Sequence, residues 1–352
     1  MTNGSKALYI VEEVKNEDVS RWDAYVEQHE GGTLYHKIAW ANLIKRTLGQ
    51  KPRYFIAKNS SGTVVGVLPL VNLKSMAFGN FLVSMPYFNY GGVLADNAEV
   101  STVLVSAATE LADSLNVSHV QFRCSEESMP SDFHLSTHKV NMILDLPESQ
   151  DALGKSIGSK RRSQIKRPIR EGVSHKIGGK ELLDHFYDVF CQNMRDLGTP
   201  VYSKKLFADI LTTFEANARI CVVYWEGKPV STGFLMHYKD RLEIPWASTV
   251  RYANRISVNM YLYWQILSYA IEEGFKQFDF GRSSIDAGTY KFKKQWGAQP
   301  HQCYWYHYVP EGKALPDLSP DNESFGLAIK IWQKLPIGIT KLIGPHIVKA
   351  IP

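Results

Sequence analysis

The sequence of 352 residues lacks the motifs of several common enzyme classes. It has no HExxH zinc motif and no glycine-rich loop that ends in Gly-Lys-Ser/Thr, and its one GxSxG pattern, at residues 154–158, does not directly follow a predicted strand as a nucleophile elbow would. Of the eleven histidines, His134 and His138 are four residues apart, but no CxxC pair accompanies them as in a zinc site. These absences disfavour serine hydrolases, zinc enzymes and P-loop NTPases, and we expect neither a metal nor a permanently bound cofactor.

Cysteine and long apolar runs are also scarce. The four cysteines are isolated and form no CxxC pair, so we expect buried thiols in a reducing compartment. No run of about 18 apolar residues could span a membrane, and the first residues lack the apolar core of a secretory signal. We therefore expect a cytoplasmic protein. Its net charge of +5 permits an anionic partner without demanding one.

The two halves of the chain repeat one order of elements, in which a hairpin is followed by a helix and a further strand. The predicted elements are strands 53–58 and 63–71, a helix from Ser101 and strand 119–123 in the first half, and strands 220–225 and 230–237, a helix from Ser257 and strand 277–282 in the second. Corresponding positions in the two halves are 159 residues apart: Pro86 corresponds to Pro245 (245 − 86 = 159) and Arg123 to Arg282 (282 − 123 = 159). We interpret this as a diverged duplication, the alternative being coincidence between two ordinary units. Each half should be a mixed α/β sheet covered by helices.

The stretch FDFGRSSIDAGTYKFKKQWG, residues 278–297, gathers polar side chains beyond the end of a strand. Charged and polar residues at that place are what a ligand site of an α/β protein needs. The alternative is a loop with a solvated basic flank.

This stretch resembles the matching region of FemAB-like acyltransferases. The matching segments are FDFGR with FKKQWG, RDLGTPVY at 195–202, SMPYFNYGG at 84–92 and SKRRSQIKR at 159–167. They are spread over roughly residues 20 to 310. The resemblance is closest to the branch that accompanies PEP-CTERM, exosortase and exopolysaccharide systems.

The resemblance implies two tandem GNAT-like domains, which we expect at residues 1–149 and 150–312, followed by a C-terminal tail at 313–352. It implies transfer of an acyl or aminoacyl group to an amine on an anionic cell-envelope, peptidoglycan or exopolysaccharide precursor. The donor would be an acyl-CoA or an aminoacyl-tRNA. Residues 250–258 lack the glycine-rich pyrophosphate signature of GNAT proteins, which favours the tRNA-type donor. The alternatives are an acetyl-CoA-dependent acetyltransferase and a binding protein that has lost the chemistry.

Three residues are the catalytic candidates that the resemblance implies. Lys293 matches a lysine that would stabilise charge at the reacting ester, the alternative being a solvated lysine beside Lys294. Arg282 would hold a carboxylate or phosphate with its planar fork, or pair with Asp279. Asp279 would orient Arg282 or accept a proton.

The remaining candidates are substrate contacts and phosphate contacts. For substrate we expect Arg195 and Tyr202 on the acceptor side, Tyr290 and Trp296 as cleft walls, Lys294 as a further contact, and Asn89 and Tyr90 in the first domain. A run from Lys155 to Arg170 carries seven cations and no acid, and could hold phosphates or form a solvated helix face. The phosphate candidates are Lys160, Arg161, Arg162 and Arg255.

The tail is basic and amphipathic. Phe325, Ile329, Trp332 and Leu335 recur on one helical face, and Pro336 should end that helix. The first interpretation is a helix packed against the second domain. The alternative is a peripheral anchor on the inner face of an anionic membrane.

Overall fold

The computed structural model describes residues 8–76, 78–315 and 323–351, and its contacts divide the chain into two compact units. The first unit comprises the described residues of Met1–His138, Gln302–Pro316 and Ala350–Pro352. The second comprises those of Lys139–His301 and Asp317–Lys349. This division falls at His138, and not at the expected boundary after residue 149.

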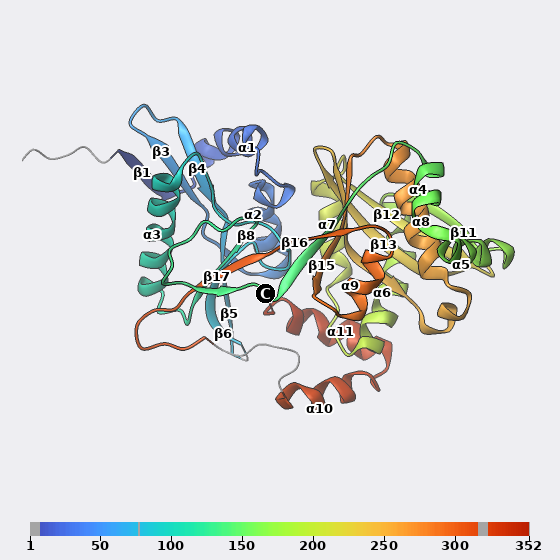
Figure 1. Ribbon diagram of the computed structural model, residues 1–352. Helices are drawn as coiled ribbons and strands as arrows, with labels where there is room; N and C mark the ends of the chain where they lie inside the picture. Colours follow the sequence, from blue (N-terminus) through green and yellow to red (C-terminus); the bar gives the residue numbers. More distant parts are fainter. Residues whose placement is uncertain (1–7, 77, 316–322, 352) are drawn as a thin grey trace, which may run out of the picture. The chain divides into compact units, whose positions relative to one another are not determined.

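The second unit is built on one seven-stranded sheet, in the order β11-β12-β13-β14-β15-β10-β16 (Figure 1). The strands are β10 (Lys139–Asp145), β11 (Ser174–Gly178), β12 (Ala218–Trp225), β13 (Lys228–Tyr238), β14 (Arg241–Thr249), β15 (Gln277–Ser284) and β16 (Gln299–Gln302). The helices are α4 (Gln150–Ser156), α5 (Gly158–Arg170), α6 (Leu183–Leu197), α7 (Lys204–Thr213), α8 (Val258–Glu272), α9 (Gly288–Lys294), α10 (Glu323–Trp332) and α11 (Ile337–Val348).

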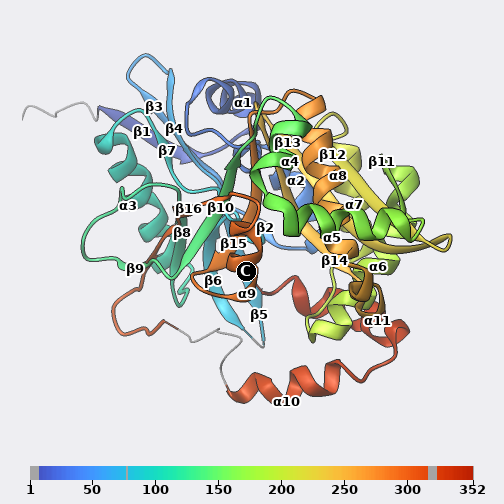
Figure 2. The same cartoon turned by 45° about the vertical axis from the view of Figure 1, so that its right-hand side comes forward.

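Helices cover both faces of this sheet, so its central strands are apolar on both sides. Adjacent residues of β13 show the two faces. Leu235 packs into the cluster formed with α8, whereas the ring of Phe234 meets Phe186 of α6 and Phe207 of α7. The turned view shows α4, α5 and α8 grouped together (Figure 2). The predicted hairpin turn at Glu226 and Gly227 is present, with φ of 52° and 74° at these two residues.

The first unit contains a four-stranded and a six-stranded sheet, in the orders β1-β3-β4-β7 and β2-β5-β6-β8-β17-β9. Its strands are β1 (Tyr9–Glu13), β2 (Lys51–Pro52), β3 (Phe55–Asn59), β4 (Val64–Leu68), β5 (Leu70–Ser75), β6 (Gly79–Ser84), β7 (Leu94–Ala95), β8 (Val120–Cys124), β9 (His134–Ser136) and β17 (Tyr304–Tyr308). Its helices are α1 (Val19–Gln28), α2 (Ala39–Leu43) and α3 (Ala98–Ser114). Helix α3 begins three residues before the expected Ser101, because the side chain of Asn97 caps it by accepting from the N–H of Val100.

The repeated order of elements is confirmed. In the first unit β6 and β8 are parallel and α3 connects them, and in the second β14 and β15 are parallel and α8 connects them. Each of the two sheets also takes in a strand from elsewhere in the chain. Strand β10 pairs with β15 and β17 pairs with β8, which is why the boundaries at 149 and 312 differ from the observed division.

The C-terminal helices pack on the second unit. Arg195 Nη1 donates to the carbonyl of Leu335 at 3.2 Å, and Lys341 pairs with Asp188 of α6 at 3.0 Å. The expected face of Ile329, Trp332 and Leu335 is the one turned inward, whereas the side chain of Phe325 lies outside the described residues. Among the described residues, no helix has the length and apolar character needed to cross a bilayer. All four cysteines are buried, as expected, and no disulfide joins them.

Candidate functional site

The candidate site begins where the two parallel strands of the second unit part. Strands β14 and β15 pair over three residues only, from Arg241 with Gln277 to Glu243 with Asp279. Strand β14 also contains a register shift against β13 after Glu243, at Ile244 and Pro245. A bulge redirects a strand and ends its regular pairing. The carboxyl ends of β14 and β15 are therefore released from each other, with α8 connecting the two strands.

A second bulge lies in β15 itself and is centred on Gly281. Against β10, Asn141 pairs with Arg282 and Ile143 with Asp279, so β15 has one residue more than its partner in this interval. Gly281 has a φ of 75°, which glycine adopts without the cost that a Cβ would impose. The buried carboxylate of Asp279 accepts the N–H of Gly281 at 2.7 Å. Asp279 therefore positions the backbone of the bulge.

Lys293 closes the bulge from α9. Its side chain is only 7% exposed, so it is not the solvated lysine of the alternative interpretation. Its Nζ donates to the carbonyls of Gly281 and Arg282, both at 2.9 Å. Burial lowers the pKa of Lys293 to about 8, with the charge of Asp279 raising it and that of Arg282 lowering it further. An ammonium has three donors, so one remains for another acceptor.

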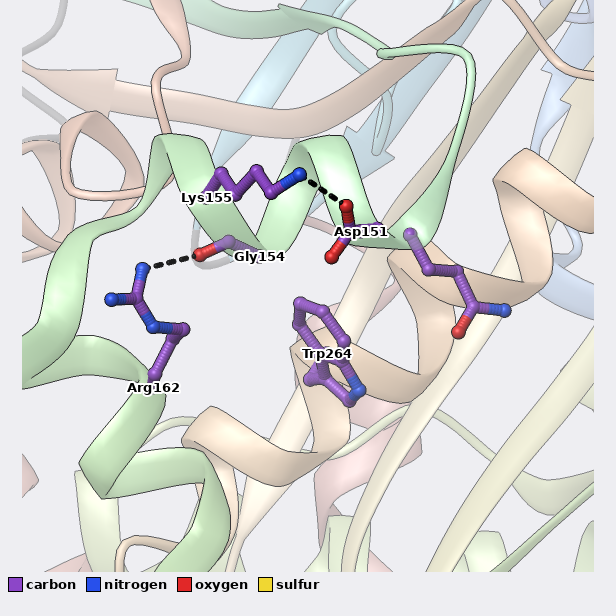
Figure 3. A pocket seen from close by; sticks show the side chains of 6 residues that line it. Asp151, Gly154, Lys155, Arg162 and Trp264 are labelled. Carbon is purple, nitrogen blue, oxygen red and sulfur yellow. Dashed lines mark hydrogen bonds and ion pairs between the residues drawn. The ribbon is translucent and has the colours of Figure 1, made fainter.

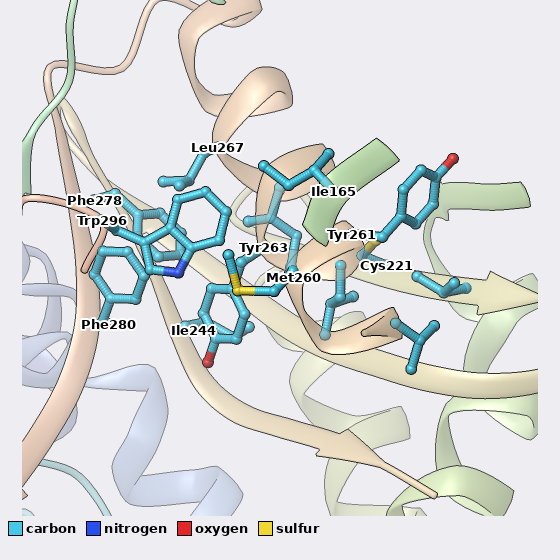
Figure 4. Packing of buried hydrophobic residues seen from close by; sticks show 14 of the residues in the cluster. Ile165, Cys221, Ile244, Met260, Tyr261, Tyr263, Leu267, Phe278, Phe280 and Trp296 are labelled. Carbon is cyan, nitrogen blue, oxygen red and sulfur yellow. The ribbon is translucent and has the colours of Figure 1, made fainter. Parts of the chain in front are cut away.

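The neighbours of Lys293 fall into an exposed and a buried group. Arg282 and Lys294 are exposed, and Lys294 lies 5.7 Å from the ring centre of the half-buried Tyr290. Trp296, expected as a cleft wall, is 1% exposed and packs in the core with Tyr263 and Phe280 (Figure 4). Its large apolar ring is buried because Phe292 and Trp296 are four residues apart and turn the same way around the end of α9.

The expected acceptor contacts lie on the α6 face of the sheet. Arg195 is committed to Asp196 at 2.7 Å and to the tail carbonyl described above. The half-buried Tyr202 meets the ring of Trp246 edge-on at 6.1 Å. Trp246 belongs to the freed part of β14 and was missed by the sequence reasoning. Its position 159 residues after Tyr87 is the signal that could have found it.

The cations expected to hold phosphate lie at two places in the second unit. Lys160, Arg161 and Arg162 project from α5, where Lys160 is exposed and the two arginines are half-buried. No ion pair with a carboxylate involves these three among the residues that the structure describes. Arg255 lies elsewhere, before α8, with its guanidinium 4.8 Å from the ring centre of Trp225.

In the first unit, the counterpart of Arg282 has a structural role. Arg123 is 2% exposed, donates to the carbonyl of Phe88 at 2.5 Å and lies 4.4 Å from the ring centre of Trp305. It thereby holds the loop that carries Asn89 and Tyr90, of which Tyr90 is buried and Asn89 half-buried. Among residues 8–76, 78–315 and 323–351, no cluster of metal-ligating side chains is found.

Comparison with known proteins identifies the class of domain. Residues 159–294 match the acetyltransferase (GNAT) domain family. Over 162 residues, 44% of this chain, the sequence is 29% identical to UDP-N-acetylmuramoylpentapeptide-lysine N(6)-alanyltransferase from Weissella viridescens. The matched part spans about half (48%) of that protein.

Solved structures show the same fold over most of the chain. The crystal structure of FemX superposes with a TM-score of 0.64 at 16% identity, covering 85% of this chain and 97% of that one. A tandem GNAT protein from the clavulanic acid pathway gives a TM-score of 0.54 at 11% identity, covering 86% and 98%. The predicted α/β fold with tandem GNAT domains is therefore confirmed, and its second unit contains a domain of the acyltransferase class.

Proposed function

We propose that this protein is a FemAB-type N-acyltransferase that transfers an acyl or aminoacyl group to an amine on an anionic cell-envelope precursor. The observation that carries the proposal is the buried ammonium of Lys293 beside the parted strands β14 and β15. The alanyltransferase relative from Weissella viridescens supports an aminoacyl donor and a peptidoglycan-type acceptor. The FDFGR and FKKQWG segments favour the branch associated with PEP-CTERM and exopolysaccharide systems.

The reaction needs only what this site contains. The amine nitrogen of the acceptor attacks the carbonyl of the donor ester or thioester, a C–N bond forms, and the C–O or C–S bond breaks. The leaving oxygen or sulfur takes up a proton, and the nitrogen gives one up to water. Lys293 would stabilise the negative oxygen of the tetrahedral intermediate with its third donor, a contribution worth about 3–4 kcal/mol where such donors have been removed. Exposed Arg282 would hold an anionic group of a substrate.

The cations of α5 would hold the acyl donor by its phosphates. Lys160, Arg161 and Arg162, with Arg255, would bind the phosphates of aminoacyl-tRNA or of an acyl-CoA. The helix that follows β14 begins at Val258 after a 3-10 turn, Arg251–Ile256, which has no glycine. This departure favours tRNA, and acetyl-CoA remains the second candidate because of the matched acetyltransferase domain.

A peripheral contact with anionic membrane would bring the enzyme to lipid-linked precursors. Leu327 and Leu342 of the tail helices are 68% and 72% exposed, and Ile331 is 54% exposed. The tail from residue 325 onward contains four lysines and no acid. An apolar helical face flanked by lysines is typical of helices that lie in an anionic interface.

The test is a transfer assay with the full chain, a UDP-linked muropeptide acceptor, and either alanyl-tRNA or acetyl-CoA as donor. We expect Lys293→Ala to lower kcat by about tenfold to a thousandfold, and Lys293→Arg to restore it in part because a guanidinium has a different shape. The matched control is Lys291→Ala, which removes an exposed lysine from the same helix. Unchanged kcat in Lys293→Ala, with a donor that the wild type uses, would remove Lys293 from the mechanism.

A further inference from the structure

A pocket of about 520 Å³ lies on the second unit, between α4, α5 and α8 (Figure 3). It is lined by Gln150, Asp151, Gly154, Lys155, Arg162 and Trp264. The volume is in the range of pockets that hold small organic ligands. None of the catalytic candidates lines it.

Trp264 is the feature that gives this pocket an aromatic wall. It is half-buried on α8, beside the core stripe of Leu262 and Ile266. A Cβ built on Gly154 would stand 3.5 Å from Trp264 Cη2, so the glycine leaves open the space beside the edge of the indole. Part of the ring therefore borders the pocket. An indole beside a polar pocket offers a platform on which a planar ligand can stack.

Two cations complete the pocket. Arg162 Nη1 donates to the carbonyl of Gly154 at 2.9 Å, which holds the guanidinium beside the pocket. Lys155 Nζ lies 2.6 Å from Asp151 Oδ2, and both of these side chains are about three-quarters exposed, at 77% and 76%. An ion pair so exposed to water is weak, so the lysine can turn to another anion. Arg162 has no carboxylate partner among the described residues, and its remaining donors suit a phosphate.

We propose that this pocket binds a nucleotide, with the base stacked on Trp264 and its phosphate held by Arg162 and Lys155. Stacking accepts any base because every base has a π face, whereas the cations require a phosphate. The exposed Lys160, on α5 like Arg162, would bind a further phosphate. The inference rests on the proposed function, whose donor or acceptor carries the nucleotide. An adenine nucleotide would belong to coenzyme A or to the 3′ end of a charged tRNA, and a uridine nucleotide to the acceptor.

The experiment is calorimetric titration of the full chain with AMP, UMP and coenzyme A, and with adenosine as a probe that lacks phosphate. We expect at least one of the three nucleotides to bind with a measurable Kd. Trp264→Ala should raise that Kd by about fivefold to 150-fold, in line with the loss of one stacked base. Trp264→Phe should retain most of the affinity because a ring remains. Arg162→Gln should weaken the nucleotide and leave the affinity for adenosine unchanged.

Lys228→Gln is the matched control, since it removes an exposed lysine at the start of β13 in the same unit and should leave the Kd unchanged. Thermal unfolding of each variant checks its fold, and should Trp264→Ala not fold, Trp264→Phe and Arg162→Gln carry the test. A preference for AMP and coenzyme A assigns the pocket to the donor, and a preference for UMP assigns it to the acceptor. The proposal is overturned when none of the nucleotides binds, or when the Kd is the same in wild type, Trp264→Ala and Arg162→Gln.

These outcomes are separate from failure of the proposed function. Transfer that depends on Lys293, together with nucleotide binding indifferent to Trp264, would keep the function and overturn the pocket. Nucleotide binding that depends on Trp264, in a protein with no transfer activity, would keep the pocket and overturn the function.

Discussion

Lys293 should make the activity and the stability of this protein respond to alkaline pH in opposite directions. The perturbation is a rise in pH from about 7 to 10, applied to the wild type and to Lys293→Met. In the folded protein, burial lowers the pKa of this lysine from its ordinary 10.5 to about 8. The ammonium that would stabilise the intermediate is therefore lost above about pH 8, and kcat should fall there.

The sign of the stability effect follows from proton binding. Between about pH 8 and 10.5 the lysine is protonated in the unfolded chain and deprotonated in the folded one. The unfolded state then binds more protons, so the contribution of this group to the free energy of unfolding rises with pH. The full difference in pKa corresponds to on the order of 3 kcal/mol, of which most appears between pH 8 and 10.

Two measurements check this reasoning. The first is kcat against pH for the wild type and for Lys293→Arg. The kcat of this variant should not decline near pH 8, because its guanidinium stays charged. The second is urea unfolding at pH 7.5 and 9.5, compared between the wild type and Lys293→Met so that other titrating groups cancel. A lowered pKa of Lys293 is refuted when the wild type and Lys293→Met show the same change in unfolding free energy between pH 7.5 and 9.5. A role of its charge in turnover is refuted when wild-type kcat stays flat up to pH 9.5.

Three further predictions address the bulge, the basic helix and the tail. Gly281→Ala should cost about 1–2 kcal/mol of unfolding free energy, because a Cβ opposes its φ of 75°, and it should lower kcat as well. Unchanged stability of this variant in urea would contradict the requirement for glycine at the bulge. Reversal of Arg161 and Arg162 to glutamate should weaken binding of the tRNA or acyl-CoA donor and flatten its salt dependence, measured by titration at several salt concentrations; an unmoved salt slope would mark α5 as a solvated face. The whole chain should float with anionic liposomes at low salt, and a chain ending at Asp321 should not; equal flotation of the two would exclude the tail as anchor, and loss of folding in the shorter chain would mark it as a packing element.

Local patterns predicted much of the second unit. The strand into Arg282 and the hairpin turn at Gly227 are both present. These features depend on the conformational freedom of glycine and on spacing within a few residues, which a sequence displays directly. The residues alone did not predict that Lys293 is buried, because the run KFKKQW offers three lysines and only the helical turn of α9 decides which one faces inward.

Pairing between distant segments could not be predicted in the same way. Nothing in the residues of β10 says that this strand pairs with β15 and so belongs to the second unit. The same holds for β17, which pairs with β8 from a position 180 residues further along the chain (304 − 124 = 180). Period and propensity describe one strand at a time, whereas its partner is chosen by the sheet that the whole chain builds.

The two units use equivalent arginines in different ways. The two arginines at the offset of 159 end equivalent strands, yet their environments have diverged. Arg123 is buried, and its guanidinium is committed to the carbonyl of Phe88, to Gln121 and to the face of Trp305. Arg282 is exposed, and the backbone around it is held instead by Asp279 and Lys293. A buried arginine that packs against tryptophan stabilises a loop, because its donors are spent inside the fold. An exposed arginine on a bulge braced by two buried charges lies within reach of an anion in solution. The proposed catalytic residues Asp279, Arg282 and Lys293 all belong to the second unit, whereas the first unit uses the corresponding arginine to hold a loop.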